Sequence, residues 1–400
     1  MKLFSLFKIP GGLKLLLSQM VQTTASPLSA FWTFPCVLFS ALLIAWAAEA
    51  AQFLISQGMA LAILAWVQTL PEFAVEAVIA WEAGKDPSRI HLMTANFTGA
   101  LRLLTGLGWP MIYATAAFFH RKRSGQPLRQ IVLDEEHCVE VVSLCPPLAY
   151  FFFIWWKASL TLVDGIVLFL FYALYLVVLN KIPPQEAEKI EDVEAIPRWI
   201  LRQSKVLRTT VISSLFLAGA LILYLVAHPF LESMLALALG MGVSTFIFVQ
   251  WDPPFLSEFP EKISAFYWAR KVDSAPMAVM NMVSSNINQW TLLVAMLPVV
   301  YSMSQGHLST IYFSPDQRAE ILLTIAQSVL GMLLLANMSY NWIEASGLFL
   351  LWFIQFIFPH THYPISFVYF GWAAWRLAIG FSRPDQLRAF VLFPQLMKRK

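Results

Sequence analysis

Apolar segments long enough to cross a lipid bilayer recur along this chain, from near residue 30 to near residue 380. A helix needs about 20 predominantly apolar residues to cross the hydrocarbon core of a bilayer. With 58% hydrophobic and 13% charged residues among 400, the chain has too much apolar surface to bury in the core of a soluble protein. The sequence therefore predicts an integral membrane protein that is all helical, because lipid cannot satisfy exposed backbone polar groups.

The apolar segments form two groups of five, separated by a polar segment. The expected spans of the first group lie near 30–48, 53–82, 90–118, 139–157 and 160–180. Those of the second group lie near 209–227, 232–270, 275–303, 317–338 and 340–358. An extra span is expected near 364–380.

The expected organisation follows from these groups. Residues 29–180 and 209–358 form the two five-helix repeats, and residues 359–400 form an extra helix with a basic tail. Residues 181–208 are too few for a folded domain and are expected to be a polar linker. Residues 1–28 are expected to be an interfacial segment rather than a cleaved signal, because prolines and glycines interrupt the apolar run and no clear cleavage site follows.

A short motif is duplicated in the two groups. Thr69-Leu70-Pro71-Glu72 lies in the second expected span, and Glu258-Phe259-Pro260-Glu261 lies in the seventh. Each is followed by a segment rich in small polar residues, 94–99 in the first group and 281–286 in the second. A second copy of a five-span unit must enter the membrane from the opposite side, because five is odd. The sequence therefore predicts inverted repeats, which are a transporter architecture with the site near the midplane.

Lysine and arginine accumulate in cytoplasmic loops and test this topology. Segments 120–130, 181–208, 270–271 and the C-terminal tail fall on one side and hold most of the basic residues. The opposite side holds Lys85, Arg89, Lys157 and Arg318, and the N-terminal lysines stay unexplained. We expect the protein to reside in a bacterial inner membrane.

Four carboxylates lie inside expected spans: Glu72, Glu76, Glu258 and Glu261. A carboxylate in a bilayer costs several kcal/mol unless it faces a wet cavity or a cation. The adjoining prolines break or kink the helix and free carbonyl oxygens, which hard cations such as Ca²⁺ or Na⁺ accept as ligands together with carboxylates. Further oxygen ligands are expected from Thr69, Asn96 and Asn281. The alternative is that the proline-glutamate pairs are helix boundaries and that Glu76 and Glu258 are solvated at the interface.

The two proline-glutamate elements, each followed by a helix with small polar residues, resemble the two α-repeats of the cation/calcium antiporter superfamily, which includes the sodium/calcium exchangers. The resemblance extends to about residue 358. It implies that Glu72 and Glu261 are the central cation-binding carboxylates and that Ca²⁺, Na⁺ or both are transported. It also implies ligand roles for Thr69, Ser257, Ser285 and Asn286.

The chain departs from the family pattern in its first half. Gly99-Ala100-Leu101 stands where the family presents a glycine-serine-asparagine turn, and Arg102 follows at once. A guanidinium there could pair with Glu72 or Glu261 and remove the need for a cation. Two hypotheses therefore stay open: a secondary cation antiporter, and a transport-inactive accessory subunit of a larger membrane complex.

Other function classes find no support in the sequence. The net charge of +3 is small and the basic residues are scattered near span ends, so nucleic acid is not an expected partner. The three cysteines show no metal-binding or disulfide spacing. No catalytic motif or phosphate-binding loop is present, so we expect neither an enzyme nor a cofactor. Asp164 and Glu344 begin helices and are expected to be structural, because acids complement the helix dipole there.

Overall fold

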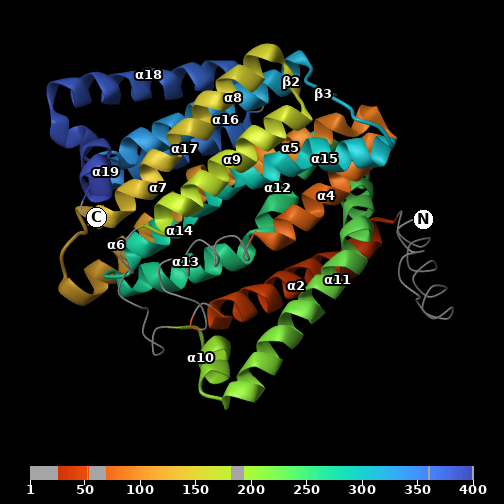
Figure 1. Cartoon of the computed structure of the whole chain (residues 1–400), viewed down its shortest axis with the longest axis horizontal. Helices are drawn as coiled ribbons and strands as arrows, with labels where there is room; N and C mark the ends of the chain where they lie inside the picture. The colour runs from red at the N-terminus through yellow and green to blue at the C-terminus, as the bar shows by residue number, and fades with distance from the viewer. Residues whose placement is uncertain (1–25, 52, 54–68, 182–192, 359–360, 399–400) are drawn as a thin grey trace.

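The computed structural model describes residues 26–51, 53, 69–181, 193–358 and 361–398. The interfacial helix expected within residues 1–28 and much of the span expected at 53–82 lie outside these residues. Within them the fold is all helical apart from two short strand pairs, as the sequence predicts (Figure 1).

The first half contains six helices that carry the argument below, with short turns between them. These are α2 (Ala30–Ala51), α4 (Leu70–Lys85), α5 (Ile90–Leu103), α6 (Trp109–Ser124), α8 (Cys145–Lys157) and α9 (Leu162–Leu179). Between them lie η2 (Pro27–Ser29), η4 (Pro87–Arg89), the π-helix η5 (Leu104–Gly108), β1 (Gln130–Val132), η6 (Glu135–His137), α7 (Cys138–Ser143) and β2 (Ser159–Leu160).

The second half repeats this order of elements. Its helices are α11 (Lys205–Gly240), α12 (Thr245–Ser257), α13 (Phe259–Lys271), α14 (Ala275–Asn288), α15 (Val294–Gln305), α16 (Pro315–Leu335) and α17 (Trp342–Ile357). Between them lie the π-helix η8 (Gln289–Leu293), β3 (Ile311–Tyr312) and β4 (Ser339–Asn341). The short α10 (Ala195–Leu201) lies in the segment expected as linker, and α18 (His362–Ser382), η10 (Pro384–Leu387) and α19 (Arg388–Lys398) follow the second half.

Two span boundaries expected from the sequence are wrong. The break expected between residues 227 and 232 is absent, because α11 continues through Pro229 as one helix of 36 residues. The second proline-glutamate motif does not lie late in a span: it forms the junction between α12 and α13. Proline removes one backbone hydrogen bond, and the surrounding packing decides whether the helix continues or ends there.

Among the residues that the structure describes, five helical segments are long and apolar enough to cross a membrane. They are Pro27–Ala51, Glu135–Lys157, Leu162–Leu179, Lys205–Gly240 and Pro315–Leu335. Other expected spans are assembled from shorter helices joined end to end, such as α5 with α6 through η5 and α14 with α15 through η8. This is an integral membrane protein.

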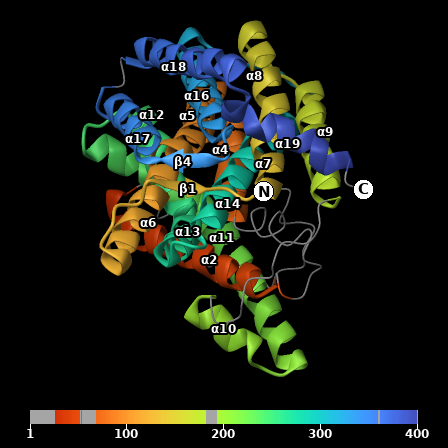
Figure 2. The ribbon, with the colours of Figure 1, turned by 90° about the vertical axis from the view of Figure 1, so that its left-hand side faces the viewer.

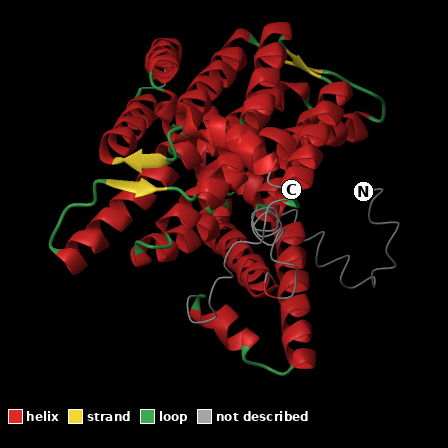
Figure 3. Ribbon diagram, turned by 60° about the vertical axis from the view of Figure 1, so that its left-hand side comes forward, coloured by secondary structure: helices red, strands yellow, loops and turns green. Residues whose placement is uncertain are grey.

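The two strand pairs join the halves reciprocally. Strand β1 of the first half pairs antiparallel with β4 of the second, and β2 of the first half pairs with β3 of the second. The two pairs lie on different sides of the molecule (Figure 3), and β1 and β4 are seen side by side in Figure 2. A pseudo-two-fold axis between two copies of one unit produces such reciprocal strand pairing. The pairing therefore supports the inverted repeat.

Matching backbone features recur in the two halves. Helices α6 and α15 both end at a left-handed glycine, Gly125 with φ 71° and Gly306 with φ 78°. Helices α9 and α17 both begin with a capping box, completed by Asp164 and Glu344 respectively, which confirms the structural role expected for these acids. Their side chains accept hydrogen bonds from the cap backbone, so each helix start is satisfied internally.

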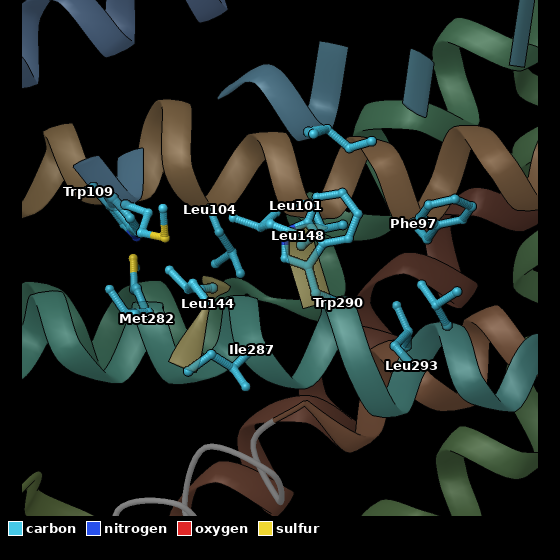
Figure 4. Packing of buried hydrophobic residues seen from close by; sticks show 14 of the residues in the cluster. Phe97, Leu101, Leu104, Trp109, Leu144, Leu148, Met282, Ile287, Trp290 and Leu293 are labelled. Carbon is cyan, nitrogen blue, oxygen red and sulfur yellow. The ribbon is translucent and has the colours of Figure 1, made fainter. Parts of the chain in front are cut away.

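The core lies where corresponding helices of the halves meet. Figure 4 shows α5 continuing through η5 into α6 and, antiparallel to it, α14 continuing through η8. Trp109 faces Met282, and Leu104 points toward α14 near Ile287. All of these side chains are buried. Helices α2 and α11 pack along each other at one side of this core (Figure 1).

Candidate cation-binding site

Both proline-glutamate motifs begin helices. Pro71 lies at the start of α4 and Pro260 at the start of α13, which puts Glu72 and Glu261 in the first helical turns. Proline is favoured at this position because the first backbone amides of a helix have no intrahelical partner. The partial positive charge of a helix N-terminus also stabilises an acid in the first turn. The sequence expectation of an interrupted helix at the second motif is confirmed at the α12–α13 junction.

The carboxylates gather in the protein interior. Glu72, Glu76, Glu258 and Glu261 are each 0–1% exposed, so the alternative of solvated interfacial acids for Glu76 and Glu258 is wrong. Glu72 lies close enough to Glu258 and Glu261 for repulsion between their charges. The motifs of the two halves therefore contribute to one cluster, although they are far apart in the sequence.

Gln289, the first residue of η8, connects the two motifs. Its side-chain amide donates to Glu72 Oε2 at 2.8 Å and to Glu258 Oε1 at 2.9 Å. A π-helix inserts an extra residue per turn and re-aims the side chains around it. Both amide hydrogens of Gln289 are therefore used by carboxylates. Its amide oxygen has no hydrogen-bond partner among the described residues.

Lys262 supplies a positive charge to the cluster. It follows Glu261 directly on α13, is 6% exposed, and its Nζ lies 2.6 Å from Glu258 Oε2. Glu76 is held separately: it accepts a hydrogen bond from the Asn96 amide of α5. Among the described residues, Glu72, Glu76 and Glu261 have no cationic hydrogen-bond partner, and Glu72 and Glu261 are the two of these that belong to the duplicated motifs.

Several buried oxygen atoms around these two carboxylates lack hydrogen-bond donors within the described segments. They are Glu72 Oε1, Glu261 Oε1 and Oε2, Ser285 Oγ and Gln289 Oε1. Ser285 lies beside Glu261, but no hydrogen bond of normal geometry joins them. A buried polar atom without a partner costs free energy, and a hard cation satisfies such oxygens.

The histidine, cysteine, aspartate and glutamate side chains of the described segments form no group of three or more arranged to hold a metal ion. A cation at this place would therefore depend on carboxylates together with amide and hydroxyl oxygens. That donor set suits Ca²⁺ or Na⁺ and does not suit a thiolate- or imidazole-binding metal.

The remaining predicted ligands occupy three different situations. Ser257 donates to the Pro253 carbonyl at 2.8 Å within α12. Asn286 donates to the Leu101 carbonyl at 3.5 Å, so it contacts α5 across the helix pair. Thr69 and Asn281 are 1% and 3% exposed, and Thr69, the first residue of the first motif, directly precedes α4.

Arg102 does not enter the carboxylate cluster. Its guanidinium forms an ion pair with Glu320 of α16, donates to Gln355 of α17 at 3.0 Å and lies 5.2 Å from the Trp251 ring centroid. Its expected pairing with Glu72 or Glu261 is therefore wrong. Glu320 is also approached by His362 Nδ1 at 2.9 Å and by Gln250 Nε2 at 2.8 Å.

Sequence reasoning missed Lys262, Gln289 and Glu320. The sequence could have indicated Lys262, because a charged lysine inside a membrane span, like a glutamate there, needs a partner for its charge. Gln289 lies one helical turn after Asn286 and could have been added to the polar face of that helix. Glu320 had no local signal, because its partner Arg102 is 218 residues away.

Comparison with known proteins agrees with this architecture. The family model described as sodium/calcium exchanger protein matches residues 28–180 and 212–359. No curated protein matches the chain.

Solved structures share the fold. A crystal structure of the H+/Ca2+ exchanger CAX superposes with a TM-score of 0.86 and 30% sequence identity, over 96% of this chain and 98% of that one. The sodium-calcium exchanger NCX_Mj gives a TM-score of 0.51 at 14% identity, over 82% and 97% of the two chains. Native YfkE gives 0.54 at 16% identity, over 85% and 98%.

Proposed function

The chain belongs to the sodium/calcium exchanger family of cation antiporters, and we propose that it exchanges a divalent cation such as Ca²⁺ for protons at Glu72 and Glu261. The observation that carries this proposal is the meeting of two helix starts from opposite halves, with carboxylate oxygens that no described donor satisfies. Choosing protons as the counter-ion rests on the 30% identity to an H+/Ca2+ exchanger over nearly the whole chain.

The chemistry follows from burial. Two carboxylates that are 1% and 0% exposed cannot both stay ionised without a compensating positive charge. A divalent cation supplies that charge in one state, and protons on the carboxyl groups supply it in the other. Cation and protons therefore exclude each other at the same oxygens, which is the requirement for antiport.

The fold offers a route to alternating access. Inverted repeats can rock against each other around a site between them, so that the site opens to one side and then to the other. The helix starts of α4 and α13 belong to different halves, so such a motion would change the space between Glu72 and Glu261.

The experiment is cation flux in proteoliposomes. Purified protein with an imposed pH gradient should accumulate Ca²⁺, and Glu72→Gln and Glu261→Gln should each reduce the rate to that of empty liposomes. Glu135→Gln is the control, because Glu135 is half exposed and pairs with Arg388 at the surface. Absence of flux in the unmodified protein under Na⁺, K⁺, Ca²⁺ and pH gradients would favour the accessory-subunit alternative.

The Arg102 pairing that motivated this alternative is replaced by the Arg102–Glu320 pair. The bacterial inner membrane as location, and association with a larger membrane complex, remain predictions. Cell fractionation and co-purification from native membranes would test them.

A further inference from the structure

Two buried glutamates outside the carboxylate cluster occupy equivalent positions in the two halves. Glu140 lies on α7 and Glu320 on α16, and they are 4% and 1% exposed. The number of residues between them equals the number between Asp164 and Glu344, the acids of the matching capping boxes. Glu140 follows the loop after α6, and Glu320 follows the loop after α15. The inverted repeat therefore puts them toward opposite faces of the membrane.

The two glutamates have different partners. Glu320 forms an ion pair with Arg102 and accepts a hydrogen bond from Gln250. Glu140 Oε2 has no hydrogen-bond partner among the described residues, and His137 Nδ1 lies 3.9 Å from it, too far for a hydrogen bond. No lysine or arginine of the described segments forms an ion pair with Glu140. An unpaired carboxylate inside a membrane protein is costly, and it marks an ion pathway more often than a structural contact.

A row of polar side chains leads from Glu140 to the candidate site. Tyr175 of α9 lies close enough to Glu140 for an electrostatic interaction, and its hydroxyl lies 3.1 Å from Ser284 Oγ. Ser284 directly precedes Ser285 on α14, and Ser285 lies beside Glu261. Helix α7 also packs against α14. Oxygen atoms therefore connect Glu140, near one face, to the carboxylates in the interior.

The equivalent row is missing in the other half. Gln355 of α17 stands at the position equivalent to Tyr175, and it accepts a hydrogen bond from Arg102 at 3.0 Å. Helix α5 has Gly99-Ala100 where α14 has its two serines, so it offers no hydroxyl at these positions. A Cβ atom on Gly99 would lie 1.8 Å from a backbone oxygen of α12, so the two helices are in close contact there. Arg102 thus neutralises Glu320 in a tightly packed region.

We infer that Glu140 attracts the divalent cation on its way between the face of the basic loop after α6 and the site at Glu72 and Glu261, whereas Arg102 removes this role from Glu320 at the opposite face. The inference rests on the proposed function. A carboxylate along an approach raises the local cation concentration and the rate of entry by about tenfold or more. Because Glu140 lies outside the cluster, its charge should affect entry from its own face and not the translocation of a bound cation.

The experiment measures initial rates of Ca²⁺ uptake at a fixed pH gradient, in sealed membrane vesicles that expose either the face of the loop after α6 or the opposite face. Glu140→Gln should raise KM for Ca²⁺ about tenfold at the first face, with the maximal rate and the KM at the opposite face unchanged. The difference should shrink at high salt, because salt screens charges. Glu140→Asp, which keeps the charge, should retain most of the low KM. Tyr175→Phe should raise KM at the same face only.

The matched control lies at the equivalent position of the other half. Arg102→Met/Glu320→Met removes a glutamate and its partner together, and it should leave KM at both faces unchanged. A rise in KM for Glu140→Gln that is equal at both faces, or that does not depend on salt, would overturn the inference and leave antiport standing. A face-specific rise in the control variant would also overturn it.

Two further outcomes are distinguishable from these. Absence of Ca²⁺ uptake by the unmodified protein contradicts the proposed function, and the inference falls with it. If Glu140→Gln does not fold, Tyr175→Phe carries the test, because it removes one hydroxyl and keeps the aromatic ring. An unchanged KM in this variant at the face of the loop after α6 contradicts the row of polar side chains as the route.

Discussion

The side-chain amide of Gln289 donates to both Glu72 and Glu258, at 2.8 and 2.9 Å, and so joins carboxylates that belong to different halves of the chain. Glu72 lies on α4 of the first half, whereas Glu258 and Gln289 lie in the second. The candidate site therefore exists only where the halves meet.

The first prediction concerns this bridge. Gln289→Leu should lower the unfolding temperature in detergent, because a hydrogen bond to a charged group contributes about 1.5–3 kcal/mol. Ca²⁺ should raise the unfolding temperature of the variant more than that of the unmodified protein, because the cation neutralises carboxylates that have lost their shared donor. Gln126→Leu, in an exposed loop, is the control. Equal Ca²⁺-dependent shifts in both proteins would contradict the role assigned to Gln289.

The second prediction concerns the buried pair of Arg102 and Glu320, which are 0% and 1% exposed at the side chain. Arg102→Met should destabilise the protein by about 3–5 kcal/mol, because Glu320 keeps a buried charge without its guanidinium partner. The double variant Arg102→Met/Glu320→Met should recover much of this loss, measured by thermal unfolding in detergent.

A matched control for that pair is available at the surface. Arg388 and Glu135 lie 3.1 Å apart with about half of each side chain exposed. Arg388→Met should change the stability by about 0–1 kcal/mol. If both arginine variants behave alike, the buried pair has no special structural role.

The third prediction concerns the contact between α5 and α12 at Gly99. A Cβ atom at this position would lie 1.8 Å from the Gln250 carbonyl oxygen, so Gly99→Ala must push the helices apart. We expect a loss of about 1–3 kcal/mol or more from overpacking and poor monodispersity on size exclusion. Gly371→Ala on α18 is the control, because no described atom beyond its own stretch of helix lies within 4 Å of its Cβ position. A stable Gly99→Ala protein would show that the two helices are not tightly packed.

The fourth prediction concerns the topology of the repeats. The loops after α6 and α15 begin at matching left-handed glycines, and the inverted repeat puts these loops on opposite sides of the membrane. Gln126→Cys and His307→Cys, in a protein without its three native cysteines, should react with a membrane-impermeant maleimide from opposite sides. The basic loop containing Gln126 should be cytoplasmic. Labelling of both from the same side would rule out the inverted arrangement.

The sequence pattern predicted helix starts where the neighbouring residues alone determine them. The prolines next to Glu72 and Glu261, expected to break or kink a helix, lie at helix starts, and Asp164 and Glu344 lie at helix starts as expected. The helix break expected from the sequence near Pro229 is wrong, because a proline can end a helix or lie within one. Neighbouring helices supply the packing that makes the difference.

The sequence by itself determined that the chain spans a membrane, that it contains two related halves, and that a proline-glutamate element recurs in each. These properties follow from apolar length, internal repetition and residue spacing, all of which are local. Only the tertiary structure decided which partners the buried charges have. Arg102 pairs with Glu320, and Gln289 joins Glu72 to Glu258, across separations of 218, 217 and 31 residues. An ion pair in a low-dielectric interior is selected by which helices pack together, and no local pattern records that choice.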